Sequence, residues 1–200
     1  MEEANAISRF LADIQVDLGD FDFRIKQLKA KEERLLRVKE TFSKGQSSDL
    51  NSFFNDIIIG ADFGWNQGIA QRSAYDDLLG SGKLGIIKNP DIRFNITNYY
   101  RNYEDQHNRM DERETAYPNL SYQLIPRNKI HQGESEMEVK LGLTNEQLSE
   151  LAELVNNSPI RSHVTAEINL ARFIRGITID VQSLAMNLKK QLEEYQKEIE

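Results

Sequence analysis

Two long amphipathic segments, one at each end of the chain, constrain the fold most strongly. Their apolar residues recur in alternating steps of four and three, which places them on one stripe of a helix, as in coiled coils. In residues 4–43 the seam reads Ile7, Leu11, Ile14, Leu18, Phe21, Ile25, Leu28, Glu32, Leu35, Lys39 and Phe42. From residue 159 onward it reads Ile160, Val164, Glu167, Ala171, Ile174, Thr178, Val181, Ala185, Leu188, Leu192, Tyr195 and Ile199. Each such helix needs a partner that covers its stripe, so the pattern predicts a bundle.

The sequence therefore predicts an all-α fold, an elongated antiparallel bundle built on the two long terminal helices. A third helix should run from Asn89 to about Ala116, where Tyr117-Pro118 stops it. Asn89 suits the N-cap position of this helix, and Pro90 suits its first helical position. Shorter accessory helices are expected over residues 49–59, 73–79 and 144–155, and Thr144 with Gln147 forms a capping box for the last of them.

We expect residues 1–200 to form a single domain with an irregular insert at about residues 118–143. Prolines and glycines are spread through this insert, and they interrupt both helical and strand periodicity. Within it, Ser121 to Ile125 could form a short extended piece or one helical turn.

Composition excludes several classes of function. The net charge of −7 disfavours nucleic acid as a partner, because an acidic surface repels phosphate. The chain has no cysteine, which excludes disulfides, zinc–thiolate sites and cysteine nucleophiles. No stretch approaches the roughly 18 apolar residues of a membrane span, and the first residues lack the features of a signal peptide.

The motifs of common enzymes are absent from the sequence. Gly80-Ser-Gly-Lys-Leu84 resembles a phosphate-binding loop but has Asp77 where the loop needs its first glycine, and Leu84 where it needs Ser or Thr. There is no Gly-x-Ser-x-Gly nucleophile elbow. We therefore predict a protein that is not an enzyme, with no catalytic residues and no cofactor.

Two pairs of residues have spacings seen in metal sites. Glu104 and His107 form half of a di-iron carboxylate motif, which needs a second copy that the other histidines do not supply. His163 and Glu167 lie four residues apart, and a lone pair of this kind is weak support for a metal. We predict no metal site, and a metal-dependent enzyme is the least favoured alternative.

A ligand site is expected where aromatic and polar residues converge. The candidate binding residues are Trp65, Arg93, Tyr99, Tyr100 and Tyr103. The only tryptophan, Trp65, lies in a glycine-rich segment, where it either packs on an end of the bundle or stays exposed at a ligand mouth or an interface.

The central segment, residues 73–104, carries a run of matched positions: Tyr75, Leu78, Ser81, Gly82, Leu84, Ile87, Asn89, Tyr99 and Tyr100. With this run the chain resembles a bacterial family of uncharacterised membrane-anchored proteins. The resemblance implies an N-terminal transmembrane helix followed by an extracytoplasmic helical domain, on the periplasmic face of the inner membrane. The 200 residues hold no such helix, so the anchor would either precede them or be lacking in this member. The resemblance implies no activity.

Two functions of different classes follow from these observations. The first is a non-enzymatic sensor or ligand-binding module presented outside a membrane. The alternative is a structural scaffold or oligomerisation domain, whose helix faces bind a protein partner or a second copy of the chain.

Overall fold

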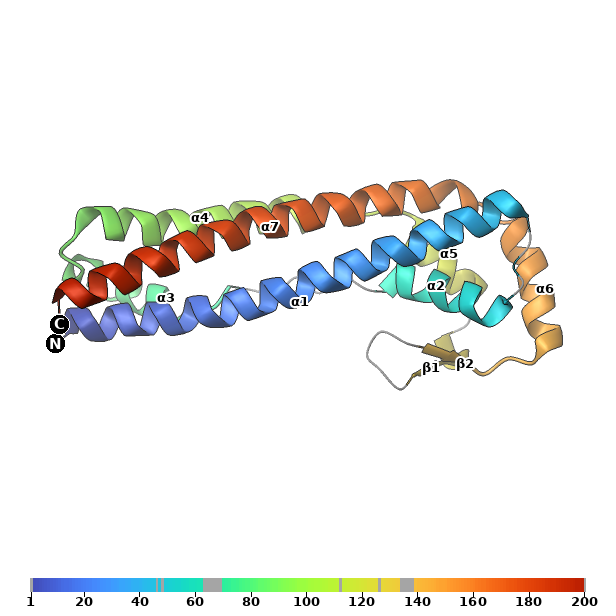
Figure 1. The fold of residues 1–200 in the computed structure, drawn as a ribbon, viewed down its shortest axis with the longest axis horizontal. Coiled ribbons are helices and arrows are strands. Elements are labelled where there is room, and N and C mark those ends of the chain that lie inside the picture. The colour runs from blue at the N-terminus through green and yellow to red at the C-terminus, as the bar shows by residue number, and fades with distance from the viewer. Residues whose placement is uncertain are drawn as a thin grey trace. The chain divides into compact units, whose positions relative to one another are not determined.

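The computed structural model describes residues 2–45, 47, 49–62, 70–111, 113–125, 127–133 and 139–199. Its α-helices are α1 (Glu2–Lys44), α2 (Leu50–Asp62), α3 (Ser73–Gly80), α4 (Pro90–Asp111), α5 (Tyr117–Leu124), α6 (Asn145–Asn156) and α7 (Ile160–Ile199). Short 3-10 turns, η1 (Leu84–Ile86) and η2 (Arg127–Lys129), and two strands, β1 (Ile130–Gln132) and β2 (Val139–Leu141), complete the elements. The predicted all-α bundle class is confirmed (Figure 1).

The contacts within the chain group it into two compact units. Unit 1 comprises residues 1–25, 67–112 and 176–200, and unit 2 comprises residues 26–66 and 113–175. The two long helices α1 and α7 each contribute one part to each unit. The single-domain assignment stays a prediction.

In unit 1, the first part of α1 and the last part of α7 run antiparallel, so that the start of α1 lies close to the end of α7 (Figure 1). The amide of Gln196 donates a hydrogen bond to Ser8 at 3.0 Å, and the hydroxyl of Tyr195 donates to Glu3 at 2.5 Å. α4 lies beside α7, and Asn95 donates to Gln191 at 2.8 Å. The core of this unit includes Ile7, Phe10, Ile14, Phe21, Ile92, Ile96, Tyr99, Tyr100, Val181, Ala185, Leu188 and Leu192.

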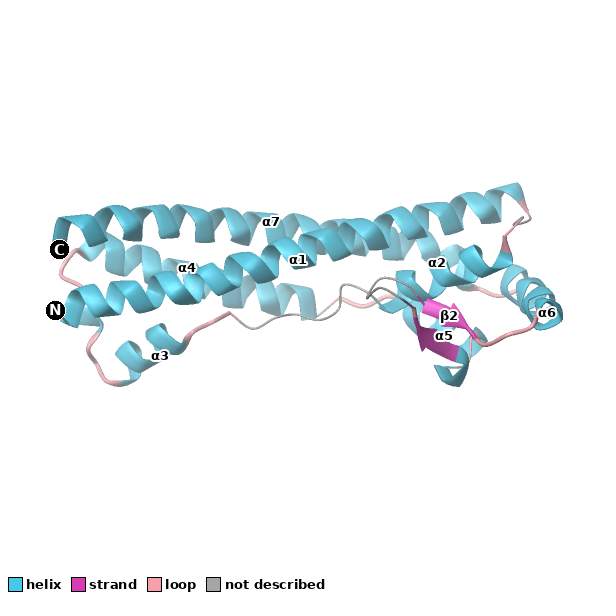
Figure 2. Ribbon diagram, turned by 60° about the horizontal axis from the view of Figure 1, so that its bottom comes forward, coloured by secondary structure: helices cyan, strands magenta, loops and turns pink. Residues whose placement is uncertain are grey.

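In unit 2, α2 packs against α5 and α6 beside the last part of α1 and the first part of α7. Its core includes Leu35, Val38, Phe42, Phe54, Ile57, Tyr117, Ile125, Val155, Ile160, Val164 and Ile168. Strands β1 and β2 form an antiparallel pair in which Ile130 lies opposite Leu141 and Gln132 opposite Val139 (Figure 2).

The seam predicted for α7 is confirmed, and only Ile199 at its end is half-buried rather than buried. The seam predicted for α1 is confirmed at seven of its eleven positions and wrong at four. The buried positions of α1 are Ile7, Phe10, Ile14, Asp17, Phe21, Arg24, Leu28, Lys31, Leu35, Val38 and Phe42, together with Ala6 and Glu32. Leu11, Leu18 and Ile25 flank this seam and are half-buried, and Lys39 is exposed. Three of the buried positions, Asp17, Arg24 and Lys31, are polar. A pattern based on apolar residues therefore does not select them.

The helix starts that were predicted from capping residues are confirmed. The side chain of Asn89 accepts from the backbone N–H groups of Asp91 at 2.9 Å and Ile92 at 3.3 Å. Thr144 and Gln147 form the reciprocal pair of a capping box. These bonds satisfy first-turn amides that have no partner inside the helix.

Two expectations for the middle of the chain are corrected. The third helix, α4, ends at Asp111 rather than near Ala116. The supposedly irregular insert contains α5, which begins at Tyr117, and the β1–β2 pair. Pro118 marks a helix start here rather than a stop, because proline lacks only an amide that the first turn does not use. The strands are three residues long, too short to show alternation in the sequence.

Within the described ranges, no helix combines the length and the apolarity that crossing a membrane requires.

Candidate functional site

The structure brings three of the five predicted binding residues together. Tyr99, Tyr100 and Tyr103 lie on α4 in unit 1, with ring centroids 5.0 Å apart for Tyr99 and Tyr100 and 6.3 Å apart for Tyr99 and Tyr103. Arg93 is elsewhere on α4, where its guanidinium donates to the carbonyl oxygens of Ile87 and Lys88 and holds the connection before the helix. Trp65 lies outside the described residues.

The tyrosines form part of the core as well as a surface. Tyr99 and Tyr100 are each 2 % exposed, and Tyr75 of α3 stacks on Tyr100 with ring centroids 4.6 Å apart. Phe21 of α1 packs against Tyr103, which is half-buried. Tyr103 is therefore the member of the cluster that a ligand can reach.

A buried carboxylate, Asp17 of α1, lies at the inner edge of this cluster. The hydroxyl of Tyr99 donates to Asp17 Oδ2 at 2.7 Å, and the backbone N–H of Gln71 donates to Oδ1 at 2.8 Å. Burial raises the pKa of Asp17 to about 6, although both donors act to lower it. Burial likewise raises the pKa of Tyr99, so its hydroxyl stays protonated and acts as a donor.

The segment that leads into α3 is attached to α1 by two carboxylates one helical turn apart. Asp13 accepts from the Ser73 hydroxyl at 3.0 Å and from the Ala74 N–H at 2.9 Å, next to the bond between Gln71 and Asp17. No side chain at the N-cap position of α3 bonds to its first turn, so Asp13 supplies that cap from another helix. The hydroxyl of Tyr100 adds a bond to the Gln71 carbonyl at 3.1 Å.

Between this attached segment and α4 is a cleft of about 220 Å³, which we call the α4 cleft. It is lined by Ala70, Arg72, Tyr100, Tyr103, Glu104, His107 and Asn108. Arg72 spans it, with its guanidinium 3.5 Å from Glu104 on α4 and 3.2 Å from Asp76 on α3. The cleft thus offers aromatic walls together with a cation, a carboxylate and an imidazole.

In each of the two pairs with metal-site spacing, the glutamate forms an ion pair with a basic side chain. Glu104 pairs with Arg72, and Glu167 forms an ion pair with Lys31 at 2.5 Å. In the described part of the chain, no three His, Cys, Asp or Glu residues are grouped so that they could hold a metal ion.

Glu167 and Lys31 are the most deeply buried ion pair described in unit 2, with side chains 0 % and 3 % exposed. Glu167 also accepts a hydrogen bond from the hydroxyl of Thr115, which in turn accepts from the N–H of Tyr117 at the start of α5. Thr115 lines a second cleft, of about 260 Å³, together with Ala61, Glu114, Pro118, Asn119, Tyr122 and Arg127. We call it the α5 cleft.

Two other buried carboxylates of unit 2 are paired as well. Glu32 bonds Arg172 and Arg175 of α7, each at 2.5 Å. Burial acts to raise the pKa of Glu32, but these two arginines together hold it below its ordinary value. Asp56 of α2 bonds Arg34 at 3.0 Å and Arg37 at 2.7 Å. These pairs join α1 to α7 and α1 to α2 by charge as well as by apolar packing.

Sequence reasoning missed Asp17, Lys31 and Thr115 as site residues. A signal for the first two is present in the sequence: both fall on the seven-residue repeat that also contains Phe10 and Val38. Thr115 has no such signal, because it lies between α4 and α5 and is placed by its bond to Glu167.

No family model, curated protein or solved structure matches the chain. The assignment of a function to either cleft therefore depends on their geometry.

Proposed function

We propose that the chain is a non-catalytic binding module, and that the α4 cleft takes a small molecule with an aromatic or apolar body and one polar group. The observation that carries the proposal is the position of Tyr103, a half-buried ring between the tyrosine core and the cleft. A ligand ring would extend the stack of aromatic side chains, and such pairs contribute about 0.5–1.5 kcal/mol beyond the burial of their area.

The polar groups of the cleft would orient the ligand. Arg72 is tied to Asp76 and Glu104, so its charge is largely balanced, and its position is fixed before a ligand enters. His107 and Asn108 lie one turn further along α4 than Glu104 and add hydrogen-bonding groups. Apolar walls with a few placed polar groups are the usual composition of small-molecule sites.

Ligand-observed NMR with the full 200-residue chain tests this proposal. The probes are phenol, indole, benzoate and benzamidine, which share a ring and differ in charge. At least one should bind, and Tyr103→Leu should abolish its binding. Tyr195→Leu is the matched control, because Tyr195 is another packed tyrosine of unit 1 that does not line the cleft. Absence of binding by every probe, or equal loss in both variants, would overturn the proposal.

The resemblance noted above supports a cellular setting for the module. We propose that it is presented on the extracytoplasmic side of a bacterial membrane by an anchor helix encoded upstream. The coding sequence before Glu2 in the native gene should then encode about 20 apolar residues. Alkaline extraction of membranes should leave the native protein in the pellet, and its release into the supernatant would contradict the proposal.

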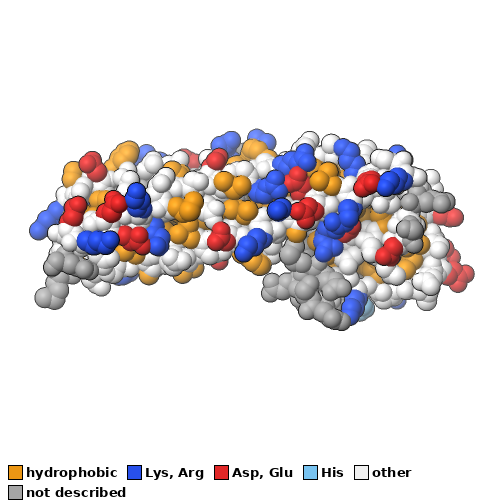
Figure 3. Space-filling model, viewed as in Figure 1, with side chains coloured by type: hydrophobic (Ala, Val, Ile, Leu, Met, Phe, Trp, Pro, Cys, Tyr) orange, Lys and Arg blue, Asp and Glu red, His pale blue; other side chains and the backbone are white. Residues whose placement is uncertain are grey.

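A second candidate function, association with another copy of the chain, is favoured by one surface. Ile179 and Met186 of α7 lie one heptad apart and are 43 % and 50 % exposed. Half-buried Leu18 and Ile25 lie on α1 of the same unit. Figure 3 shows hydrophobic side chains gathered where α1 and α7 of unit 1 run side by side.

Light scattering at increasing protein concentration tests this association. A dimer should form and should dissociate in the variant Ile179→Ser with Met186→Ser. Phe94→Ser is the control, because Phe94 of α4 is an isolated apolar residue that is 68 % exposed. A strict monomer into the millimolar range would rule out association through this surface.

A further inference from the structure

The α5 cleft of unit 2 is a second place where a ligand could be held, independent of the α4 cleft. It lies between the end of α2, the segment before α5, the first turns of α5 and Arg127 of η2. Its volume of about 260 Å³ is below the roughly 300–1,000 Å³ of sites for drug-sized ligands. A ligand of this cleft must therefore be small.

One wall of the cleft is fixed from within the core. The Thr115 hydroxyl donates to Glu167, and Glu167 is held by Lys31 at 2.5 Å. Because this ion pair is buried, its side chains have little freedom to reorient, and Thr115 stays in place whether or not the cleft is filled. A prearranged wall reduces the entropy that a ligand loses on binding.

The cleft carries opposite charges that are not paired with each other. The guanidinium of Arg127 lies over the ring of Tyr122, 4.3 Å from its centroid, which orders the side chain. Stacking leaves the N–H groups at the edge of the guanidinium free to bind a carboxylate. In the part of the chain that the structure describes, no carboxylate pairs with Arg127 and no cation pairs with Glu114.

The start of α5 adds to the positive side of the cleft. Pro118 and Asn119, in the first turn of the helix, both line it. The first-turn amides and the helix dipole give this end of a helix a partial positive charge. A carboxylate near Arg127 and this helix end would be stabilised, and an ammonium near Glu114 would complete the match.

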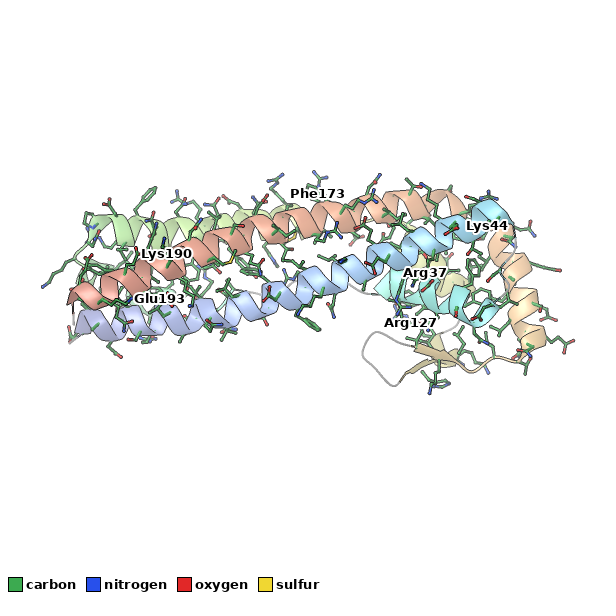
Figure 4. All side chains as sticks on the ribbon, in the orientation of Figure 1. Arg37, Lys44, Arg127, Phe173, Lys190 and Glu193 are labelled. Atoms are coloured by element: carbon green, nitrogen blue, oxygen red, sulfur yellow. The ribbon has the colours of Figure 1, made fainter. Side chains whose placement is uncertain are left out.

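We propose that the α5 cleft binds a small zwitterion of the α-amino acid or betaine class. Its carboxylate pairs with Arg127, and its ammonium pairs with Glu114. The hydroxyl of Thr115 and the amide of Asn119 supply further hydrogen bonds. Arg127, labelled in Figure 4, lines the cleft together with Ala61 at the end of α2.

The test is a titration of the full 200-residue chain, labelled with ¹⁵N, with each protein amino acid and with glycine betaine. Acetate and methylammonium, at matched ionic strength, are the half-probes. At least one zwitterion should shift the amide signals of residues 113–127 with an affinity at least roughly tenfold above that of either half-probe. Signals of residues 100–108, at the α4 cleft, should stay unchanged, so the result is independent of the function proposed for that cleft.

Substitutions of three exposed residues complete the experiment. Arg127→Gln and Glu114→Gln should each weaken binding roughly tenfold or more, because each removes one charge-assisted contact. Arg113→Gln is the matched control, because Arg113 also stacks on a ring, that of Phe173 at 4.1 Å, and does not line the cleft. Figure 4 shows Phe173 on the side of α7 turned away from α1. Circular dichroism of each variant checks that the fold is intact.

Three results would overturn the proposal. The first is no shift with any zwitterion up to its solubility. The second is equal binding of acetate with no effect of Glu114→Gln, which would make the cleft a simple anion site. The third is an equal effect of Arg113→Gln, which would show that overall charge rather than the cleft governs binding.

Discussion

The buried ion pair between Lys31 and Glu167 makes a quantitative prediction about the stability of unit 2. Both side chains are almost fully enclosed, so removing one partner leaves the other charge in a medium that solvates it poorly. Lys31→Met should lower the free energy of unfolding by about 3–5 kcal/mol. Glu167→Leu should cost a similar amount, because the buried Lys31 ammonium then loses the carboxylate that balances its charge.

The double variant, Lys31→Met with Glu167→Leu, should recover most of that loss. Two apolar side chains of similar volume fill the space without any charge to desolvate, an exchange that is often neutral or stabilising. The hydroxyl of Thr115 loses its acceptor, at a cost of about 0.5–1.5 kcal/mol, but it lines an open cleft where water can replace Glu167. We expect the double variant within about 2 kcal/mol of the wild type, hence a coupling energy of about 4 kcal/mol or more.

Urea denaturation followed by circular dichroism gives these free energies, provided that the slope with urea is the same in all four proteins. Lys29 and Glu33 are the matched control, an exposed pair on the same helix at 4.0 Å. Its double-mutant cycle should give less than about 0.5 kcal/mol. Additive losses at Lys31 and Glu167, with a coupling energy near zero, would refute the reasoning.

Three further predictions concern other parts of the fold. Asp17 has a folded pKa of about 6 against 3.8 for an unperturbed group, so its contribution to stability is complete below about pH 4 and is lost as the pH rises through about 6. Asp17→Asn should remove this pH dependence, which amounts to about 3 kcal/mol in the free energy of unfolding between about pH 4 and pH 6. Urea denaturation of both proteins across this pH range measures it, and parallel curves of free energy against pH would contradict the prediction. Gly60→Ala should destabilise the protein by about 1–3 kcal/mol in thermal and urea unfolding, because a Cβ would lie 2.6 Å from Cδ2 of fully buried Leu35. Gly19 has open space around it, so Gly19→Ala should instead stabilise the protein by up to about 1 kcal/mol. If both substitutions changed the free energy of unfolding in the same direction, the result would be inconsistent with the packing at Gly60. Asn89→Ala should cost about 1 kcal/mol and increase amide exchange in the first turn of α4, whereas unchanged exchange at Asp91 and Ile92 would argue against the cap.

Local chemistry made much of the fold predictable. Asn89 and Thr144 mark helix starts because their side chains bond to amides within three residues, so the signal and its cause lie in the same short segment. The seam of α7 could be predicted from the sequence because nearly every buried position in this helix is apolar or small. The sequence does not predict α5, because Pro118 is also typical of a position just after a helix, and only the burial of the Tyr117 ring in the core of unit 2 favours a new helix there.

The candidate sites were less predictable, because they depend on contacts between distant residues. Tyr99, Tyr100 and Tyr103 could be grouped by helical spacing, but the burial of the first two depends on Asp17 and Gln71. Thr115 gains its role only when Glu167, 52 residues later, reaches it. Residues that act across such separations leave no local pattern in a single sequence.

The polar residues in the seam of α1 also determine how far that helix can slide along its neighbours. Apolar residues that repeat every seven positions would pack almost equally well after a shift of one heptad, so they define the contacting face better than the axial position. Such a shift would place Arg24, which only donates, where Asp17 accepts from Gln71 and Tyr99 in unit 1. In unit 2 it would place Val38 opposite Glu167, where Lys31 now lies. Each unit therefore contains a buried acid–base or acid–donor contact that favours a single alignment of α1, and shifted alignments are penalised by an unpaired buried charge.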